Sequence, residues 1–101
     1  MPKIVVLFNL KPGVRVEDYE RFARETDLPI VNRLPSVRQF EVLKAQSLLG
    51  GGNSPYQYIE IIDLNSLEQL GQDVSTDTMQ KVAATFRSMA DNPQFIITEA
   101  L

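Results

Sequence analysis

Glu60 is the side chain with the clearest potential for chemistry, because it interrupts an otherwise apolar run, Tyr58-Ile59-Glu60-Ile61-Ile62. A carboxylate is rarely buried in a strand without a partner. If Glu60 faces a cavity, burial raises its pKa and makes it a proton-transfer group near neutral pH. Tyr58 lies on the same strand face and could donate a hydrogen bond to a developing enolate or phenolate. The alternative is a structural ion pair of Glu60 with Arg24, Arg38 or a cation of a partner chain.

The composition excludes several other chemistries. The chain has no His and no Cys, so acid–base chemistry must use carboxylates, Tyr, Lys or Arg, and neither a thiolate nor an imidazole metal site is available. No pair of carboxylates has the spacing of a metal site, and we expect neither a metal nor a cofactor. The net charge is −3 and the ten basic residues are scattered, which argues against nucleic acid as a partner. Apolar runs are too short to span a membrane and no leader pattern is present, so we expect a cytoplasmic protein.

The elements that would position Glu60 follow from the hydrophobic pattern. Residues 3–10 contain the continuous apolar run Ile4-Val5-Val6-Leu7-Phe8 and predict a central strand, closed by the turn Pro12-Gly13. A helix should follow from Glu17, with a kink or short break near Asp27-Leu28 because Pro29 lacks a backbone donor; it should resume and end at Pro35. We further expect strands at 37–47, 56–64 and 94–99, a loop at 48–55, a short helical turn at 66–71 and a helix at 76–90 ended by Asn92-Pro93.

This order, β-α-β-β-α-β, predicts an α+β, ferredoxin-like fold, in which one four-stranded antiparallel sheet carries two main helices on one face. Residues 1–101 then form one domain. The first and third strands are the most apolar and should be central. We expect Ile59 and Ile61 to face the helices. The opposite face would be apolar enough to need a second copy of the sheet, giving a homodimer; its residues would be Val6, Phe8, Tyr58, Ile62 and either Phe95 or Ile97.

Several residues could bind a ligand inside such a barrel. Val6, Phe8, Phe22 and Ile62 would form an apolar wall, and Glu41 could also reach the cavity. For Phe22 the alternative is a place in the core. Loosened helix before Pro29 could turn Arg24, Glu25 and Asp27 toward the pocket mouth, where Arg24 would hold an anionic group. The alternative is a solvated helix face with local ion pairs.

Six segments, spread in order over nearly the whole chain, carry a resemblance to a known group. They are residues 4–13 (IVVLFNLKPG), 23–29 (ARETDLP), 34–38 (LPSVR), 48–52 (LLGGG), 58–61 (YIEI) and 79–83 (MQKVA). Together they resemble the RedY-like/HapK group of the dimeric α/β-barrel superfamily. The resemblance implies a homodimer whose sheets face each other, a pocket between each sheet and its helices or loops, and a link to prodigiosin-type pigment biosynthesis. Wider relatives include polyketide cyclases, cofactor-free monooxygenases and isomerases. Several of these use His or Trp, which this chain lacks, so no catalytic residue is carried over.

The sequence therefore favours a small cofactor-independent enzyme or accessory protein of secondary metabolism. It would catalyse acid–base condensation, cyclisation or isomerisation of an apolar aromatic, prodigiosin-type or polyketide-like metabolite. Glu60 would be the acid/base and Tyr58 the hydrogen-bond donor. Two alternatives stay open: a non-catalytic binding or carrier protein with the same pocket, and a purely structural dimer whose interior is filled by side chains.

Overall fold

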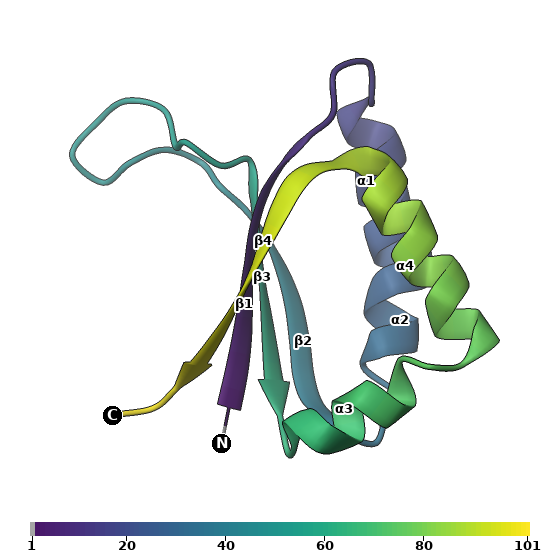
Figure 1. Cartoon of the computed structure of the whole chain (residues 1–101). Helices are drawn as coiled ribbons and strands as arrows, with labels where there is room; N and C mark the ends of the chain where they lie inside the picture. Colours follow the sequence, from purple (N-terminus) through teal and green to yellow (C-terminus); the bar gives the residue numbers. More distant parts are fainter. Residues whose placement is uncertain (1) are drawn as a thin grey trace.

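The computed structural model describes residues 2–101 and contains one antiparallel sheet with the strand order β2-β3-β1-β4 (Figure 1). The strands are β1 (Pro2–Leu10), β2 (Val37–Lys44), β3 (Tyr58–Leu64) and β4 (Ala90–Glu99). The prediction that the two most apolar strands are central is confirmed, because β1 and β3 pair with each other and each has a second neighbour. Such a position in the middle of a sheet suits a strand with a continuous apolar run, because both of its faces can be buried.

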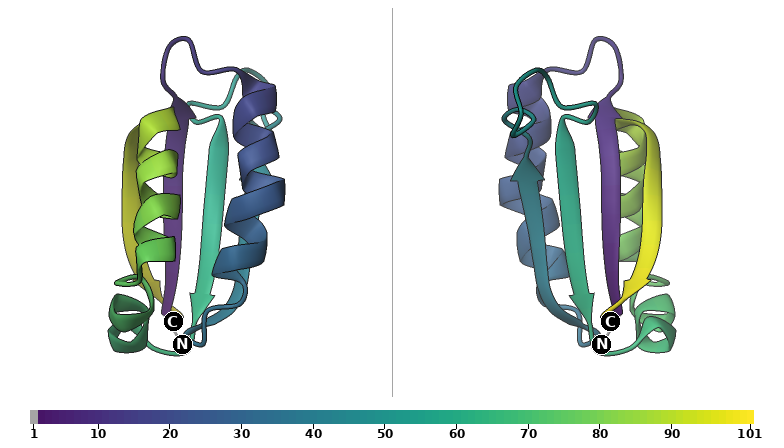
Figure 2. Two further views of the ribbon diagram at one scale, coloured as in Figure 1. Left: turned by 90° about the vertical axis from the view of Figure 1, so that its right-hand side faces the viewer. Right: turned by 90° about the vertical axis from the view of Figure 1, so that its left-hand side faces the viewer.

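All helices lie on one face of this sheet. They are α1 (Val16–Phe22), a π-helix η1 (Ala23–Asp27), α2 (Leu28–Val31), α3 (Leu67–Asp73) and α4 (Asp77–Met89). The continuous helical rod α1–η1–α2 and helix α4 run side by side along the sheet, and α3 lies at one end (Figure 2). The arrangement is the expected α+β, ferredoxin-like one. No helix within residues 2–101 combines the length and hydropathy that crossing a membrane requires.

The break expected near Asp27-Leu28 takes the form of a π-helix. Pro29 has no N–H to donate, and the N–H of Leu28 donates to the carbonyl of Ala23, five residues back. A π-helical turn accommodates one more residue than an α-helical turn. The wider turn brings Asp27 to the inner side of the rod, where only 5% of it is exposed.

The second half of the chain differs most from the prediction at the boundary between α4 and β4, while β2 ends three residues earlier and β3 begins two residues later than expected. Helix α4 begins as expected, with the side chain of Thr76 accepting a hydrogen bond from the N–H of Met79. However, Asn92-Pro93 does not end it, since the chain passes directly from Met89 into β4. Pairing with β1 already starts at Ala90 and Leu10, and this pairing satisfies the backbone. Asn92, with φ 46°, lies where the β1–β4 register shifts, so these two residues mark a sheet irregularity instead.

The core fills the space between the sheet and the helices, and here the predicted side assignment is wrong. Phe8 is fully buried and makes edge-on contacts with Tyr19 of α1 and Phe86 of α4, at ring-centre distances of 5.5 and 5.0 Å. Val6, Tyr58 and Glu60 share this helix-covered side. The side chains of β1 and β3 alternate between the two faces of the sheet as predicted. However, both faces of these strands are apolar, so the alternation alone cannot decide which face the helices cover.

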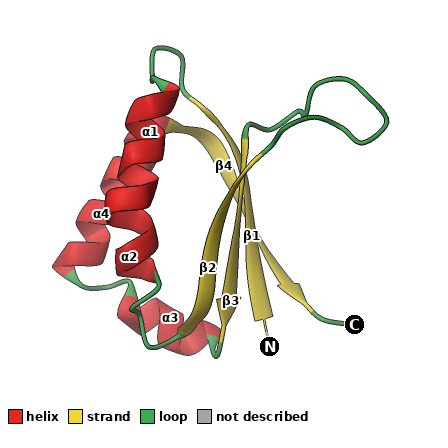
Figure 3. Ribbon diagram, turned by 180° about the vertical axis from the view of Figure 1, so that it is seen from behind, coloured by secondary structure: helices red, strands yellow, loops and turns green. Residues whose placement is uncertain are grey.

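The helix-free face carries the other alternate residues of the strands. The apolar ones are Val5, Leu7, Leu43, Ile59, Ile61 and Ile96, and we call them the helix-free patch. They are half-buried to exposed in the single chain. Figure 3 shows this open side of the sheet, and the long β2–β3 loop projects away from the helices on the same side.

Candidate functional site

Glu60 lies in the middle of β3 and points into the helix–sheet layer, where 4% of it is exposed. The hydroxyl of Tyr19, from α1, donates a hydrogen bond of 3.3 Å to its Oε2. Tyr19 itself is fully buried. Burial and the nearby carboxyls, chiefly Glu60, raise the pKa of Tyr19, which therefore stays a neutral donor. Glu60 is thus held in a fixed place by a phenol.

Asp27 of η1 is a second buried carboxyl, and it lines a pocket together with Glu60. Within the part of the chain that the structure describes, its side chain makes no hydrogen bond and no ion pair. Burial raises the pKa of Asp27 to about 6. Burial, and then the charge of Asp27, raise the pKa of Glu60 to about 8, against a smaller lowering by the Tyr19 hydrogen bond. Near neutral pH, Glu60 therefore exists in both protonation states, as proton transfer requires.

The structural ion pair that was the alternative for Glu60 does not occur within residues 2–101. Arg24 is directed to Glu20, at 3.3 Å between Nη2 and Oε1, and Arg38 makes no ion pair in this range. A cation from a partner chain would have to enter the helix–sheet layer to reach Glu60, because Glu60 does not face the open side of the sheet.

A pocket of about 310 Å³ opens in front of the two carboxyls, between the sheet and the helices. Its walls are mainly apolar and include Ile4, Val31, Phe40, Ile62, Phe86 and Phe95. Gln80 and Arg87 of α4 also line it. This is the lower end of the size range of ligand pockets, which typically combine apolar walls with a few polar groups. Of the residues predicted as a site, Glu60 and Ile62 line this pocket.

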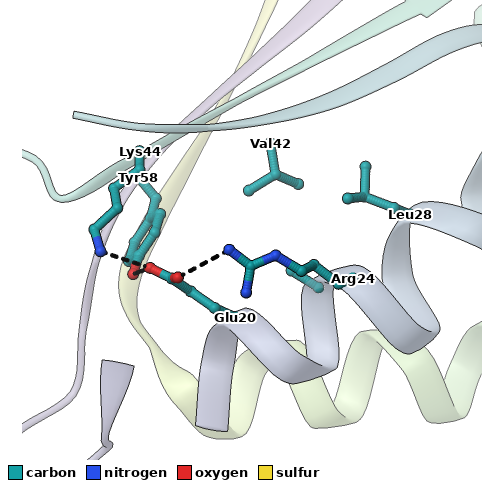
Figure 4. Close-up of a pocket in the computed structure, with 7 residues that line it drawn as sticks. Glu20, Arg24, Leu28, Val42, Lys44 and Tyr58 are labelled. Atoms are coloured by element: carbon teal, nitrogen blue, oxygen red, sulfur yellow. Dashed lines mark hydrogen bonds and ion pairs between the residues drawn. The ribbon is translucent and has the colours of Figure 1, made fainter. Parts of the chain in front are cut away.

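Tyr58 and Arg24 belong to a second, smaller pocket of about 120 Å³ (Figure 4). The Tyr58 hydroxyl donates a 2.7 Å hydrogen bond to Oε2 of Glu20, which also binds Nζ of Lys44 at 2.9 Å. The hydrogen bonds from Lys44 and Tyr58 lower the pKa of Glu20. The hydroxyl of Tyr58 is thus engaged by Glu20, and Tyr19 is the phenol that contacts Glu60.

The remaining predicted ligand contacts lie elsewhere. Val6 and Phe8 are fully buried in the core, and Phe22 packs near Tyr19 with ring centres 6.4 Å apart; none of the three lines either pocket. Glu41 does not line the pocket in front of Glu60. Val42 is the residue of β2 that pairs with Glu60, so Glu41 points to the helix-free face.

Sequence reasoning did not connect Tyr19 or Asp27 with Glu60. The sequence pattern does not show that Tyr19, 41 positions before Glu60, would reach it, and it predicts Asp27 only at the pocket mouth. The Pro29 break was the available signal, since a π-helical turn often marks a functional site. No group of three or more potential metal ligands occurs among the described residues.

The two raised pKa values predict how stability depends on pH. Folded Asp27 and Glu60 keep their protons to higher pH than in the unfolded chain, where the usual values are 3.8 and 4.5. The contribution of these two groups to the free energy of unfolding should therefore be highest below about pH 4 and fall until about pH 8, by on the order of a few kcal/mol. Urea unfolding at about pH 5 and about pH 8 measures this fall. Glu60→Gln should reduce it, and an equal fall in that variant would contradict the assignment.

Comparison with known proteins shows which family the whole chain resembles. A family model described as REDY-like protein HapK matches residues 2–101. The crystal structure of HapK from Hahella chejuensis superposes with a TM-score of 0.82 and 26% identity, over 100% of this chain and 93% of HapK. A dimeric ferredoxin-like protein of unknown function from Thermobifida fusca has a TM-score of 0.73 and 16% identity, over 98% and 90% of the two chains.

A third structure with this fold is a mutant of SnoaB from Streptomyces nogalater, described as a cofactor-independent oxygenase. Its TM-score is 0.74 at 15% identity, over 98% of this chain and 91% of SnoaB. Identities this low establish a shared fold and nothing finer. None of the curated proteins compared with the chain matches it.

Proposed function

Because the chain belongs to the REDY-like HapK family, we propose that it acts on a small molecule through proton transfer by Glu60. The observation that carries this proposal is a buried carboxyl with a pKa near 8 that lines an apolar pocket and has no cationic partner within residues 2–101. The ligand would be an apolar aromatic metabolite, prodigiosin-type or polyketide-like. The reaction class would be condensation, cyclisation or isomerisation, as part of secondary metabolism.

In this proposal Glu60 removes a proton from an acidic carbon of the ligand and returns it at another position. The Tyr19 hydroxyl holds the Glu60 carboxyl in place and stabilises its charged form by hydrogen bonding. Apolar walls exclude water, which keeps the carboxyl basic and prevents loss of the proton to solvent. No step needs a cofactor. SnoaB, which shares this fold, is described as a cofactor-independent oxygenase, so a protein with this fold can act without a cofactor.

We further propose that the protein is a homodimer joined through the helix-free patch. Six apolar residues gathered on one open sheet face form a surface that a soluble monomer seldom leaves uncovered. A second copy of the same sheet is self-complementary under a two-fold axis. The Thermobifida fusca protein that shares this fold is described as dimeric, which supports the proposal.

A carrier or binding protein is the second candidate, because a pocket with apolar walls would also hold a ligand that undergoes no reaction. Hydrogen–deuterium exchange separates the two. 2-Tetralone, an apolar bicyclic ketone with acidic C–H groups, is incubated with the protein in D₂O and followed by NMR. An enzyme of the proposed kind should accelerate exchange about 100-fold over buffer. Binding of 2-tetralone with exchange only at the buffer rate would favour the carrier.

A further inference from the structure

The pocket in front of Glu60 contains two carboxyls that other protein groups satisfy only in part. Asp27 and Glu60 are 5% and 4% exposed, so water reaches neither freely. An ionised carboxyl can accept up to about four hydrogen bonds. Within the described chain Glu60 accepts one side-chain hydrogen bond, from Tyr19, and Asp27 accepts none. Among the described residues, the fully enclosed side-chain atoms without a hydrogen-bond partner are Ser36 Oγ and Asp63 Oδ1, and the oxygens of Asp27 are not among them. Asp27, although only 5% of it is exposed, therefore presents unpaired acceptor oxygens to the pocket, where a ligand could donate to them.

The nearby cations do not serve these carboxyls. Arg24 and Lys44 are both bound to Glu20, at the other pocket. Arg87 is exposed on α4 and makes no ion pair in residues 2–101, so it lies at the rim of the pocket rather than against the carboxyls. The amide of Gln80 is directed to the carbonyl of Val74. The groups facing the carboxyl pair are therefore Tyr19, the rim residue Arg87 and apolar side chains.

The aromatic rings in the pocket wall are a second indication of the kind of ligand that binds. Phe40, Phe86 and Phe95 line the same pocket as Asp27 and Glu60. Aromatic rings attract cations as well as apolar groups, and they do so more strongly where water is excluded. The combination of buried acceptors without donors and a wall of aromatic rings is the chemistry that recognises an organic cation.

We propose that the ligand of this pocket carries a protonated nitrogen on an aromatic or otherwise apolar body, and that this nitrogen binds between Asp27 and Glu60. Suitable groups are an ammonium, an amidinium, an iminium or a protonated nitrogen heterocycle. The inference rests on the proposed ligand pocket, but it does not need the reaction to occur. It assigns Asp27 to recognition, whereas Glu60 serves both recognition and proton transfer.

Three probes with the same ring system and different charges test this inference: 1-naphthylmethylamine, 1-naphthylmethanol and 1-naphthoate. Calorimetry at neutral pH should show the amine binding at least about tenfold more tightly than the alcohol, with the naphthoate weakest. In Asp27→Asn the preference for the amine should fall to about threefold or less. The matched control is Glu25→Gln, which removes a carboxyl from the same π-helix at an exposed position and should keep the preference.

Proton release provides a readout that needs no variant. Glu60 has a pKa of about 8, so it is mainly protonated at neutral pH. A cation beside it stabilises the carboxylate, and binding of the amine should release close to one proton per site. Buffers with different ionisation enthalpies report this number in wild-type protein, even if Asp27→Asn fails to fold. The alcohol should release none.

The outcomes are distinct from those of the exchange experiment. Equal or tighter binding of the alcohol, a preference for naphthoate, or no binding of the amine would each overturn the inference, and a preference for naphthoate would point to Arg87 instead. An amine preference together with exchange at the buffer rate would support the inference and reject catalysis. Fast exchange without an amine preference would support catalysis and reject the inference.

Discussion

Glu60→Gln is expected to lower the rate of proton transfer by about 100-fold or more, because an amide has no proton to give and is not a base near neutral pH. The substitution keeps the shape of the side chain, and its amide oxygen can still accept the hydrogen bond from Tyr19. The pocket should therefore stay intact. The rate is measured as hydrogen–deuterium exchange into a bound carbon acid, in wild type and variant side by side.

Two controls separate lost chemistry from lost structure. The neutral probe 1-naphthylmethanol should bind the variant within about threefold of wild type, since it senses only the apolar walls. Glu25→Gln removes an exposed carboxyl and should leave the exchange rate unchanged. Full activity in Glu60→Gln would reject Glu60 as the acid/base. Loss of activity together with loss of neutral-probe binding would reduce Glu60 to a structural role.

Ile59→Lys is expected to convert a dimer into a monomer. Ile59 lies on the helix-free face of central strand β3, paired with Leu7 of β1 and Leu43 of β2. In a dimer joined at this face, the substitution would place an ammonium among the apolar side chains of the interface in each subunit. The cost of several kcal/mol should weaken association by about 1,000-fold or more. Sedimentation or light scattering distinguishes the 11.4 kDa chain from its dimer.

Ile97→Lys is the matched control, because it makes the same change on the same sheet at a different surface. Ile97 pairs with Ile4 and so lies on the helix side of β4, where 64% of it is exposed. The variant should remain dimeric. A monomeric wild-type protein, or a dimer that survives Ile59→Lys but not Ile97→Lys, would show that the interface is not the helix-free patch.

The element order and the central place of β1 and β3 could be predicted from the sequence, because each depends on local features. An unbroken apolar run such as residues 4–8 suits a strand in the middle of a sheet, and the apolar stripe of α4 has a helical period. The same logic located a break before Pro29. It did not show that the break is a π-helix, which depends on how the rod packs against the sheet.

The choice of sheet side could not be predicted, because β1 and β3 are apolar on both sides. Packing decides it. Phe8 and Tyr58 stack with ring centres 5.6 Å apart beneath Tyr19, filling a layer that is deep enough for aromatic rings. The prediction that Tyr58 assists Glu60 failed for a related reason, since alternation places two residues on one face but does not say which partner each hydroxyl will find.

The sequence by itself determined that a carboxyl lies within a buried strand, and that neither imidazole nor thiol chemistry is available to the protein. Those conclusions follow from residue type and strand period, which are local. Only the tertiary structure decided that Tyr19, 41 positions away, binds Glu60, and that Asp27 lies on the same pocket without a hydrogen-bond partner among residues 2–101. Such contacts depend on how one helical rod lies across the sheet, and the packing of the whole core sets that placement.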